Sequence, residues 1–195
     1  MIWIVGTGTC RGQMTERGRE LLKKADAVYG SRRAFELIDF EVKEKRVLDR
    51  FDSSVFEEIA KEGMKKDVVV LSTGDPMVAG IGRKFREIDA TVEIEPGISS
   101  VQLALAKLRV DLTEVVVVDC HARDFDSSLL DLNRYRHLLI LADRRFDPKK
   151  LGRRRVVILE NLCMENEMIK EGFADLIEIR SDYTIIFVEK DGEVV

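Results

Sequence analysis

The most constraining feature of the sequence is an apolar run, Val68-Val69-Val70-Leu71, that ends directly on a glycine-rich loop. A continuous apolar run, unlike an alternating one, is typical of a parallel strand that is covered on both faces. Parallel neighbours are joined by crossover connections, usually helices. The run therefore predicts an α/β fold with a central parallel strand over residues 68–71.

The rest of the first half reads as alternating strands and helices. Apolar residues at helical spacing predict helices over residues 15–28, 31–38, 54–64 and 99–108. Thr15 and Ser31 stand where N-caps are expected. Short apolar runs predict further strands over residues 1–5 and 91–94. This alternation indicates a mainly parallel sheet.

The pattern changes after Asp111, where strands outnumber helices. We expect strands over residues 115–118, 138–141 and 156–159, a closing pair at 177–179 and 185–188, and one short helix at 127–133. The sequence thus predicts two α/β domains, 1–110 and 111–195, the second built on a mixed sheet.

Composition excludes several classes of protein. The net charge is −4, and the basic runs Arg144-Arg145 and Arg153–Arg155 are short, so we expect solvated turns and no nucleic-acid partner. The longest apolar run is far short of the roughly 20 residues of a membrane helix, so no membrane association is expected. Three cysteines without a CxxC motif predict no metal site, and their odd number without a signal peptide predicts a cytoplasmic protein.

The loop that follows the central run, STGDPMVAGIG, raises the question of its ligand. Gly74, Gly80 and Gly82 would let the backbone approach a ligand closely. Asp75 would repel a phosphate but not a ligand with a positive centre, and S-adenosylmethionine, a sulfonium nucleoside, fits that description. The alternative is that Asp75 caps the next helix.

The N-terminal segment GTGTCRG resembles a dinucleotide-binding loop only in part. Gly6 and Gly8 are present, but Arg11 stands where the third glycine of GxGxxG belongs. We therefore reject NAD or FAD as the cofactor.

Polar residues follow three other predicted strands. Ser99 and Ser100 either cap the following helix or donate to a ligand. His121 with Arg123, and Glu160 with Asn161, either bind an acidic substrate or form solvated turns. The sequence contains no nucleophile–base motif, which suits a reaction that depends on positioning two reactants.

These segments together resemble the tetrapyrrole methylases. The resemblance rests on ADAVYGSRR (25–33), LSTGDPMVAGIG (71–82), EPGISSVQLALAKL (95–108), HAR (121–123) and LENL (159–162), and covers nearly the whole chain. It implies two α/β domains with S-adenosylmethionine in the cleft between them, a homodimer, and methyl transfer to C5 of a corrin-ring precursor.

The resemblance also implies the site residues. The expected cofactor-binding residues are Thr9, Gly74, Asp75, Met77, Val78, Ser99 and Ser100. The expected substrate-binding residues are Gly8, Arg11, Arg32, His121 and Arg123, with Arg33 as a further anchor for substrate carboxylates. His121 is the candidate base, and no protein metal ligand is expected.

Two motifs depart from the family pattern. The usual GPGD is Gly8-Thr9-Cys10-Arg11 here, and the usual His-Gly-Arg has Ala122 at its centre. Many relatives are fused to a second, decarboxylating methylase, so a separate C15-methylase is an expected partner. The alternatives are another methylase of the same fold, such as diphthine synthase, and a non-catalytic sensor of an adenosine ligand.

Overall fold

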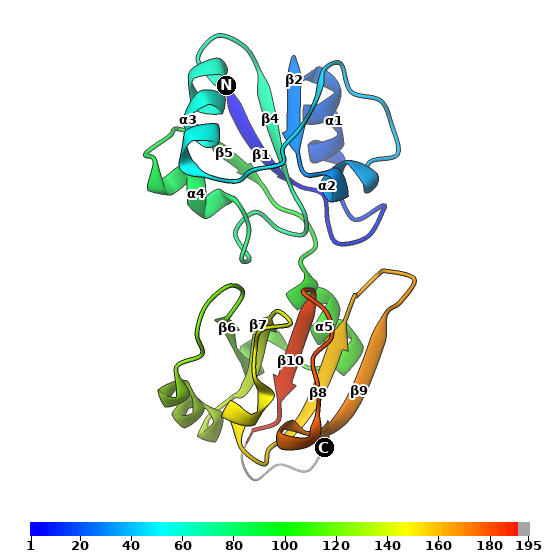
Figure 1. Cartoon of the computed structure of the whole chain (residues 1–195). Helices are drawn as coiled ribbons and strands as arrows, with labels where there is room; N and C mark the ends of the chain where they lie inside the picture. Colours follow the sequence, from blue (N-terminus) through cyan, green and yellow to red (C-terminus); the bar gives the residue numbers. More distant parts are fainter. Residues whose placement is uncertain (191–195) are drawn as a thin grey trace. The chain divides into compact units, whose positions relative to one another are not determined.

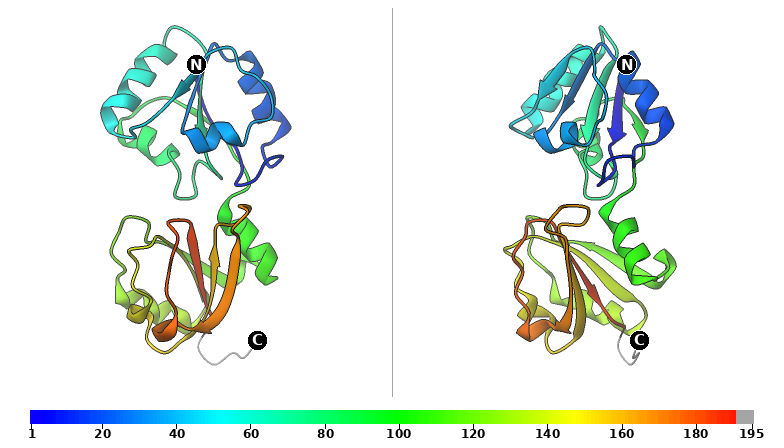
Figure 2. Two further views of the ribbon diagram at one scale, coloured as in Figure 1. Left: turned by 45° about the vertical axis from the view of Figure 1, so that its right-hand side comes forward. Right: turned by 90° about the vertical axis from the view of Figure 1, so that its right-hand side faces the viewer.

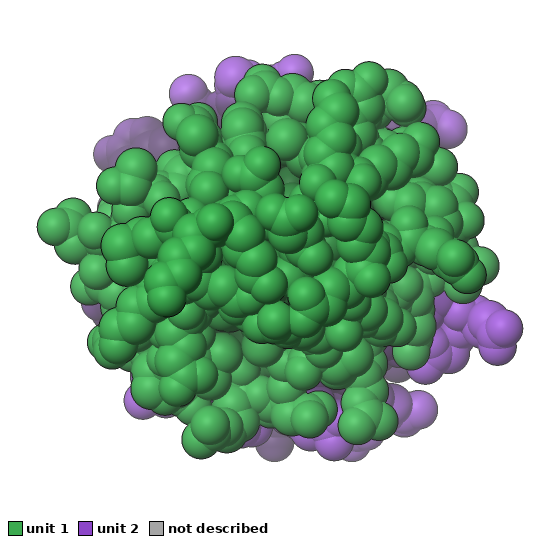
Figure 3. Space-filling model, turned by 90° about the horizontal axis from the view of Figure 1, so that it is seen from above, with its two compact units in different colours: residues 1–99 green, residues 100–195 purple. Residues whose placement is uncertain are grey.

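The computed structural model describes residues 1–190 and separates into two compact units, Met1–Ser99 and Ser100–Val195, coloured separately in Figure 3. We expected the boundary near residues 110–113. The contacts divide the chain after Ser99, so the helix that follows is grouped with the second unit. Each unit is described by itself.

The first unit is built on a five-stranded parallel sheet with the strand order β3-β2-β4-β1-β5 (Figure 1). Its strands are β1 (Ile2–Gly6), β2 (Ala27–Gly30), β3 (Lys45–Val47), β4 (Val68–Ser72) and β5 (Glu93–Glu95). β4 lies at the centre and is buried along its whole length, which confirms the prediction from its continuous apolar sequence.

Helices cover both faces of this sheet (Figure 1 and Figure 2). They are α1 (Glu16–Lys24), α2 (Arg32–Glu36), α3 (Ser53–Gly63) and α4 (Gly82–Glu87). One face packs Ile4 and Val70 against Phe56 of α3 and Phe85 of α4. Val5, Leu71 and their neighbours on the opposite face pack against α1 and α2. Alternate residues of each strand therefore serve two separate cores.

The second unit begins with α5 (Ser100–Leu108) and contains a mixed five-stranded sheet, β6-β7-β10-β8-β9. The strands are β6 (Val115–Asp119), β7 (His137–Ala142), β8 (Arg155–Glu160), β9 (Met168–Phe173) and β10 (Thr184–Val188). β6 and β7 are parallel, while β10 runs antiparallel to both β7 and β8. The predicted mixed sheet is confirmed.

Four 3₁₀ helices lie among the described residues of this unit: η1 (Leu112–Glu114), η2 (Ser127–Arg134), η3 (Pro148–Leu151) and η4 (Ala174–Leu176). Three of them flank a core that includes Leu138, Ile140, Leu151, Ile158 and Ile186. The helix predicted over residues 127–133 is thus present, but as a 3₁₀ helix.

Two predicted elements are wrong. The first helix does not reach Val28, because Ala25 turns to an extended backbone and Ala27–Gly30 forms β2. Residues 177–179 do not pair with β10. Ile177 is buried in the core after η4, and β10 pairs instead between β7 and β8.

Candidate functional site

Three loops meet at the carboxyl edge of the first sheet, and we call this region the first-sheet rim: residues 7–14, 73–82 and 96–99. Backbone bridges join the loops directly. Gly8 and Gly74 exchange two N–H···O bonds of 3.2 and 2.9 Å, and Met14 bridges Gly97. The convergence expected from the sequence is therefore present within this unit.

Glycine is required at the rim for close packing of backbone on backbone. A Cβ atom on Gly6 would lie 2.5 Å from the nitrogen of Gly97 and 2.6 Å from the oxygen of Gly74. One on Gly97 would lie 2.5 Å from that same oxygen. These distances exclude any side chain at either position without movement of the backbone.

Gly74 has different surroundings. Its φ is +73°, and a Cβ atom there would lie 3.7 Å from both Thr9 Oγ1 and Ser99 Cα, which are ordinary contact distances. Gly74 thus lies in a cradle formed with Thr9 and the buried Ser99, which a side chain would fill. Three of the residues predicted to bind the cofactor are brought together here.

Asp75 fastens this rim. Its Oδ1 accepts a 2.7 Å hydrogen bond from the backbone N–H of Met77, and its Oδ2 accepts one of 3.3 Å from Gly97. The alternative that Asp75 caps a helix is wrong, because α4 begins only at Gly82 and has no side-chain cap. Asp75 instead links the second and third loops, and its carboxylate lies where a phosphate would be repelled.

The other glycines of this loop serve its own turn. A Cβ atom on Gly80 would lie 2.5 Å from the carbonyl oxygen of Pro76, and one on Gly82 would lie 2.6 Å from Met77 Sδ. The expectation that Gly80 and Gly82 open the loop to a ligand is therefore replaced by an internal steric requirement. Met77 is exposed and Val78 half-buried, and their predicted cofactor contact stays a prediction.

Gln13 organises the first loop and was missed in the sequence. Its Oε1 accepts hydrogen bonds from the backbone N–H groups of Thr9 (3.0 Å) and Cys10 (2.9 Å). Gly8, with φ +73°, has no room for a Cβ atom, which would lie 2.3 Å from Gln13 Cβ. The side-chain amide of Gln13 thus closes the first loop. This is the loop that lacks the proline and aspartate of the family's GPGD motif.

The arginines predicted as substrate anchors of the first unit do not form one cluster. Arg11 donates through Nε to the carbonyl oxygen of Glu36 at 2.8 Å, and the exposed Arg32 pairs with Asp49 at 3.7 Å. Arg33 lies against the first loop, 3.5 Å from the carbonyl oxygen of Thr9. Its buried Nε has no hydrogen-bond partner among residues 1–190.

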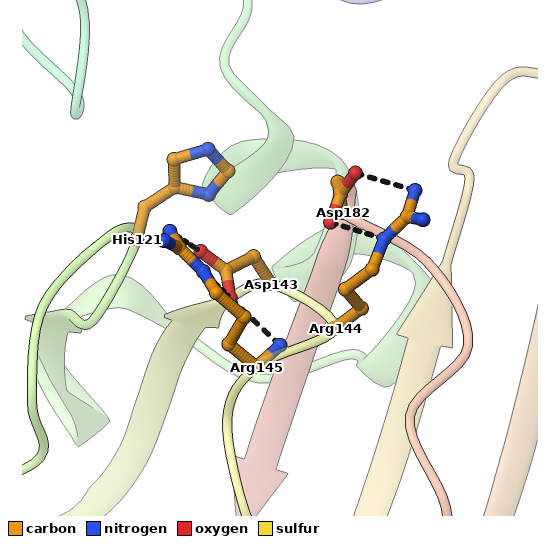
Figure 4. A pocket seen from close by; sticks show the side chains of 5 residues that line it. All are labelled: His121, Asp143, Arg144, Arg145 and Asp182. Atoms are coloured by element: carbon orange, nitrogen blue, oxygen red, sulfur yellow. Dashed lines mark hydrogen bonds and ion pairs between the residues drawn. The ribbon is translucent and has the colours of Figure 1, made fainter.

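A polar hollow of about 460 Å³ lies beside the carboxyl ends of β6 and β7 in the second sheet. It is lined by His121, Asp143, Arg144, Arg145 and Asp182, and we call it the second-sheet hollow (Figure 4). His121 follows β6, residues 143–145 follow β7, and Asp182 precedes the antiparallel β10. Because of these strand directions, all five residues lie at the same end of the strands.

Two ion pairs form much of its lining. The buried Asp143 accepts from Arg145 Nη2 (2.7 Å) and from the backbone N–H groups of Arg145 and Ala122 (both 2.9 Å). These bonds, above all the guanidinium, hold the pKa of the Asp143 carboxyl far below its usual range. Arg144 holds Asp182 at 2.7 and 2.5 Å and lowers its pKa in the same way.

His121 and Arg123 differ in their positions. The exposed His121 lines the hollow beside the Arg145–Asp143 pair, with no interaction drawn to its imidazole in Figure 4. Arg123 pairs with Asp119 at 3.5 Å and is not among the lining residues. Ala122 between them has φ +56°, a left-handed conformation that explains why glycine suits this position.

Glu160 and Asn161 hold the loop before β10. Glu160 is buried, and its Oε1 accepts from the backbone N–H groups of Arg180 (2.7 Å) and Ser181 (3.0 Å). Asn161 Oδ1 accepts from Ser181 Oγ at 2.5 Å. The structure thus favours a loop-building role for this pair over a direct ligand contact.

The adjacent arginines Arg144 and Arg145, expected to be a solvated turn, line the second-sheet hollow, which the sequence did not predict. The signal that identifies them is their place directly after β7, the same rule that singled out His121. Arg153 and Arg155, at the opposite end of β8, pair with Asp175 and Glu189.

Within residues 1–190, no group of three or more His, Cys, Asp or Glu side chains is placed to hold a metal ion. The helices of this part of the chain are too short or too polar to cross a membrane.

Glycine-bearing loops at the carboxyl edge of a parallel sheet are typical of α/β enzymes that bind ligands at that edge. The sequence profile of the Tetrapyrrole (Corrin/Porphyrin) Methylases matches residues 1–177. The chain belongs to this family, and the expectation that it is a methyltransferase is confirmed.

Two similar proteins have names that describe methylation of a precorrin. A probable cobalt-precorrin-7 C(5)-methyltransferase of Methanocaldococcus jannaschii is 32% identical over 184 residues, 87% of each protein. A solved precorrin-6Y methylase of cobalamin biosynthesis from Archaeoglobus fulgidus is 58% identical, with a TM-score of 0.89 over 100% of this chain and 99% of that one.

Two more distant solved structures show the fold alone. Uroporphyrin-III C-methyl transferase from Thermus thermophilus, complexed with S-adenosyl homocysteine, is 19% identical with a TM-score of 0.73, covering 97% of both chains. Diphthine synthase is 18% identical with a TM-score of 0.71, covering 96% of this chain and 89% of that one.

Proposed function

We propose that this protein transfers a methyl group from S-adenosylmethionine to carbon C5 of cobalt-precorrin-6B, giving cobalt-precorrin-7 in cobalamin biosynthesis. The observation that carries the proposal is the 58% identity, over the whole chain, to the precorrin-6Y methylase of Archaeoglobus fulgidus. The alternative of diphthine synthase has only the support of a shared fold at 18% identity.

The first-sheet rim fits an adenosine cofactor with a positive centre. The cradle at Gly74 leaves space beside Thr9 and Ser99, and the nearby Asp75 carboxylate disfavours a phosphate but not a sulfonium. Thr9, Gly74, Asp75, Met77, Val78, Ser99 and Ser100 would hold the cofactor. When bound, it supplies an electrophilic methyl group.

The protein contributes mainly by positioning. Bridges between the loops of the rim support the residues proposed to bind the cofactor, and alignment of two bound reactants supplies up to about 7–11 kcal/mol of the barrier reduction. We assign Gly8, Arg11, Arg32, Arg33 and Arg123 to substrate binding, the arginines through carboxylate contacts. His121, exposed at the second-sheet hollow, is the candidate acceptor for the proton that the ring loses.

The first test is chemical. The protein is incubated with cobalt-precorrin-6B and S-adenosylmethionine labelled in the methyl group, and the product is analysed by mass spectrometry and NMR. We expect one labelled methyl group at C5. Label at another ring carbon, on a protein acceptor, or only on the donor contradicts the proposal.

The second test is a substitution at the cradle. Gly74→Val should abolish binding of S-adenosylhomocysteine in calorimetry, because the side chain fills the space next to Thr9 and Ser99. The left-handed backbone adds roughly 1–2 kcal/mol of strain, which a folded domain withstands.

Gly152→Val is a stringent control for this strain, because the Gly152 backbone (φ +67°, ψ −159°) lies in a region that almost only glycine adopts. Gly152 has ordinary room for a Cβ atom and lies in the second unit at the end of η3. The control should bind the cofactor normally. Retained binding by Gly74→Val would show that the cradle does not receive the ligand.

We further propose a cytoplasmic homodimer, and a separate protein for methylation at C15 and for the decarboxylation. The chain aligns with 40% of a Sinorhizobium precorrin-6Y C(5,15)-methyltransferase [decarboxylating], at 29% identity over 167 residues. The two reactions are thus combined in that longer relative. Size-exclusion chromatography with light scattering tests the dimer.

A further inference from the structure

We propose that Arg144 is a specificity-determining residue that donates hydrogen bonds to a carboxylate side chain of the substrate in the second-sheet hollow. The inference rests on the proposed function for the identity of the substrate, a corrin-ring precursor rich in acid side chains. It assigns a role to a residue that sequence reasoning placed in a solvated turn.

Part of the Arg144 guanidinium is available to donate hydrogen bonds to a ligand. Its Nε and Nη2 are engaged by Asp182 at 2.7 and 2.5 Å, which leaves both N–H groups of Nη1 without a partner among the described residues. The side chain is 64% exposed, so these donors are accessible. Arg145 is engaged by Asp143 through the same two nitrogens, at 3.3 and 2.7 Å.

Both guanidiniums are held in place before any ligand arrives. Each is gripped along one edge by a carboxylate, a planar geometry that fixes its orientation. Asp143 is itself buried and fixed by two backbone N–H groups. Little side-chain entropy is then lost on binding, which favours recognition by these arginines.

The charges of the hollow make it selective rather than broadly attractive. Asp143 and Asp182 balance the two arginines, so there is no large excess of positive charge. Recognition must then come from directed hydrogen bonds to a well-placed acceptor such as a carboxylate. At about 460 Å³ the hollow lies within the usual range of ligand pockets, roughly 300–1,000 Å³.

The test uses cobyrinic acid, a corrin with free acid side chains, and its fully methyl-esterified form, with binding measured by equilibrium dialysis and corrin absorbance. Arg144→Gln should weaken binding of the acid about tenfold, as expected for loss of one charge-assisted contact, and leave the ester unaffected. Equal binding of the acid by wild type and variant, or no binding to either, would overturn the inference.

Asp182→Asn separates ligand recognition from a structural ion pair. Both substitutions remove the same exposed Arg144–Asp182 ion pair, so a structural role predicts equal effects. Recognition predicts unequal effects, because Asp182→Asn keeps the guanidinium and only loosens its grip. We therefore expect the acid to bind Asp182→Asn clearly more tightly than Arg144→Gln, and weakening equal to that of Arg144→Gln would refute the assignment.

Arg153→Gln is the matched control, since it removes the same charge near the opposite edge of the same sheet. It should bind the acid normally.

In the methyl-transfer assay, Arg144→Gln should raise KM for the corrinoid with little change in kcat. If wild type transfers no methyl group but this binding pattern holds, the proposed function fails and the carboxylate site stands. Normal methyl transfer by the wild type, with no effect of Arg144→Gln on KM, would refute the carboxylate site and leave the proposed function standing.

Discussion

Ala122 shows how a single backbone angle affects the second-sheet hollow. Its φ of +56° lies in the left-handed region, and its N–H donates to Asp143 at 2.9 Å. The conformation is therefore fixed by the hydrogen bond that joins the β6 and β7 loops. An alanine here bears a steric cost that glycine avoids.

Ala122→Gly should stabilise the protein by about 0.5–1 kcal/mol, measured by urea unfolding. The relief of left-handed strain, roughly 1–2 kcal/mol, exceeds the entropy that glycine adds to the unfolded chain. Ala106→Gly, at an exposed position of α5, is the opposite control and should destabilise by about 1 kcal/mol. A loss of stability in both variants would contradict this account of strain.

At the residue scale, the sequence predicts which polar residues follow the strands better than it predicts their hydrogen-bond partners. Asp75 and His121 could be singled out because each follows an apolar strand. The partners of Asp75 are backbone N–H groups of Met77 and Gly97, and every residue type except proline has such a group. Gln13 was missed for the same reason, since it binds backbone atoms.

Helix α1 is attached to the end of β5 through its N-cap. Thr15 Oγ1 accepts from the backbone N–H of Gly18 at 2.9 Å and donates to Glu95 Oε1 at 2.6 Å. Glu95 is buried at the end of β5 and is also 3.4 Å from Arg17. One hydroxyl thus begins a helix and satisfies a buried carboxylate.

Thr15→Ala should lower the free energy of unfolding by about 2 kcal/mol, roughly 1 from the lost cap and the rest from the lost hydrogen bond to Glu95. Thr15→Ser keeps the hydroxyl and should cost less than about 0.5 kcal/mol. Urea midpoints of the two variants check this. Equal losses in both would assign the effect to the methyl group instead.

At the scale of elements, strands with continuous apolar sequence were predicted well, and the others were not. β9 was missed because it is a sheet-edge strand with exposed Lys170 and Glu171. β2 was missed because Val28 continues the helical spacing of α1. Ile177 was mistaken for part of a strand because burial in a core requires the same apolar residue types.

Across the whole molecule, many carboxylates are stabilised in their charged form. Each accepts hydrogen bonds from basic side chains, hydroxyls or N–H groups that lower its pKa: Asp26, Asp39, Glu44, Asp52, Glu62, Glu87, Asp111, Asp126, Asp143, Glu167 and Asp182. The folded state therefore binds protons less readily than the unfolded chain.

The stability of the protein should accordingly be lost in acid. Since the folded pKa values lie below the unfolded values of roughly 4, this stabilisation is present above about pH 4–5 and declines as the pH falls further. Urea midpoints from pH 7 to pH 3 measure the decline. Asp143→Asn should reduce its slope. A midpoint that rises toward pH 3 would contradict the prediction.

The position of β10 affects how the second unit forms during synthesis. β10 is the last strand of the described residues, yet it lies between β7 and β8. Until the ribosome has passed Val188, these two apolar strands have no partner along the edges they later share with β10. The nascent second unit therefore exposes strand edges prone to aggregation, while the first sheet is already complete in sequence by Glu95.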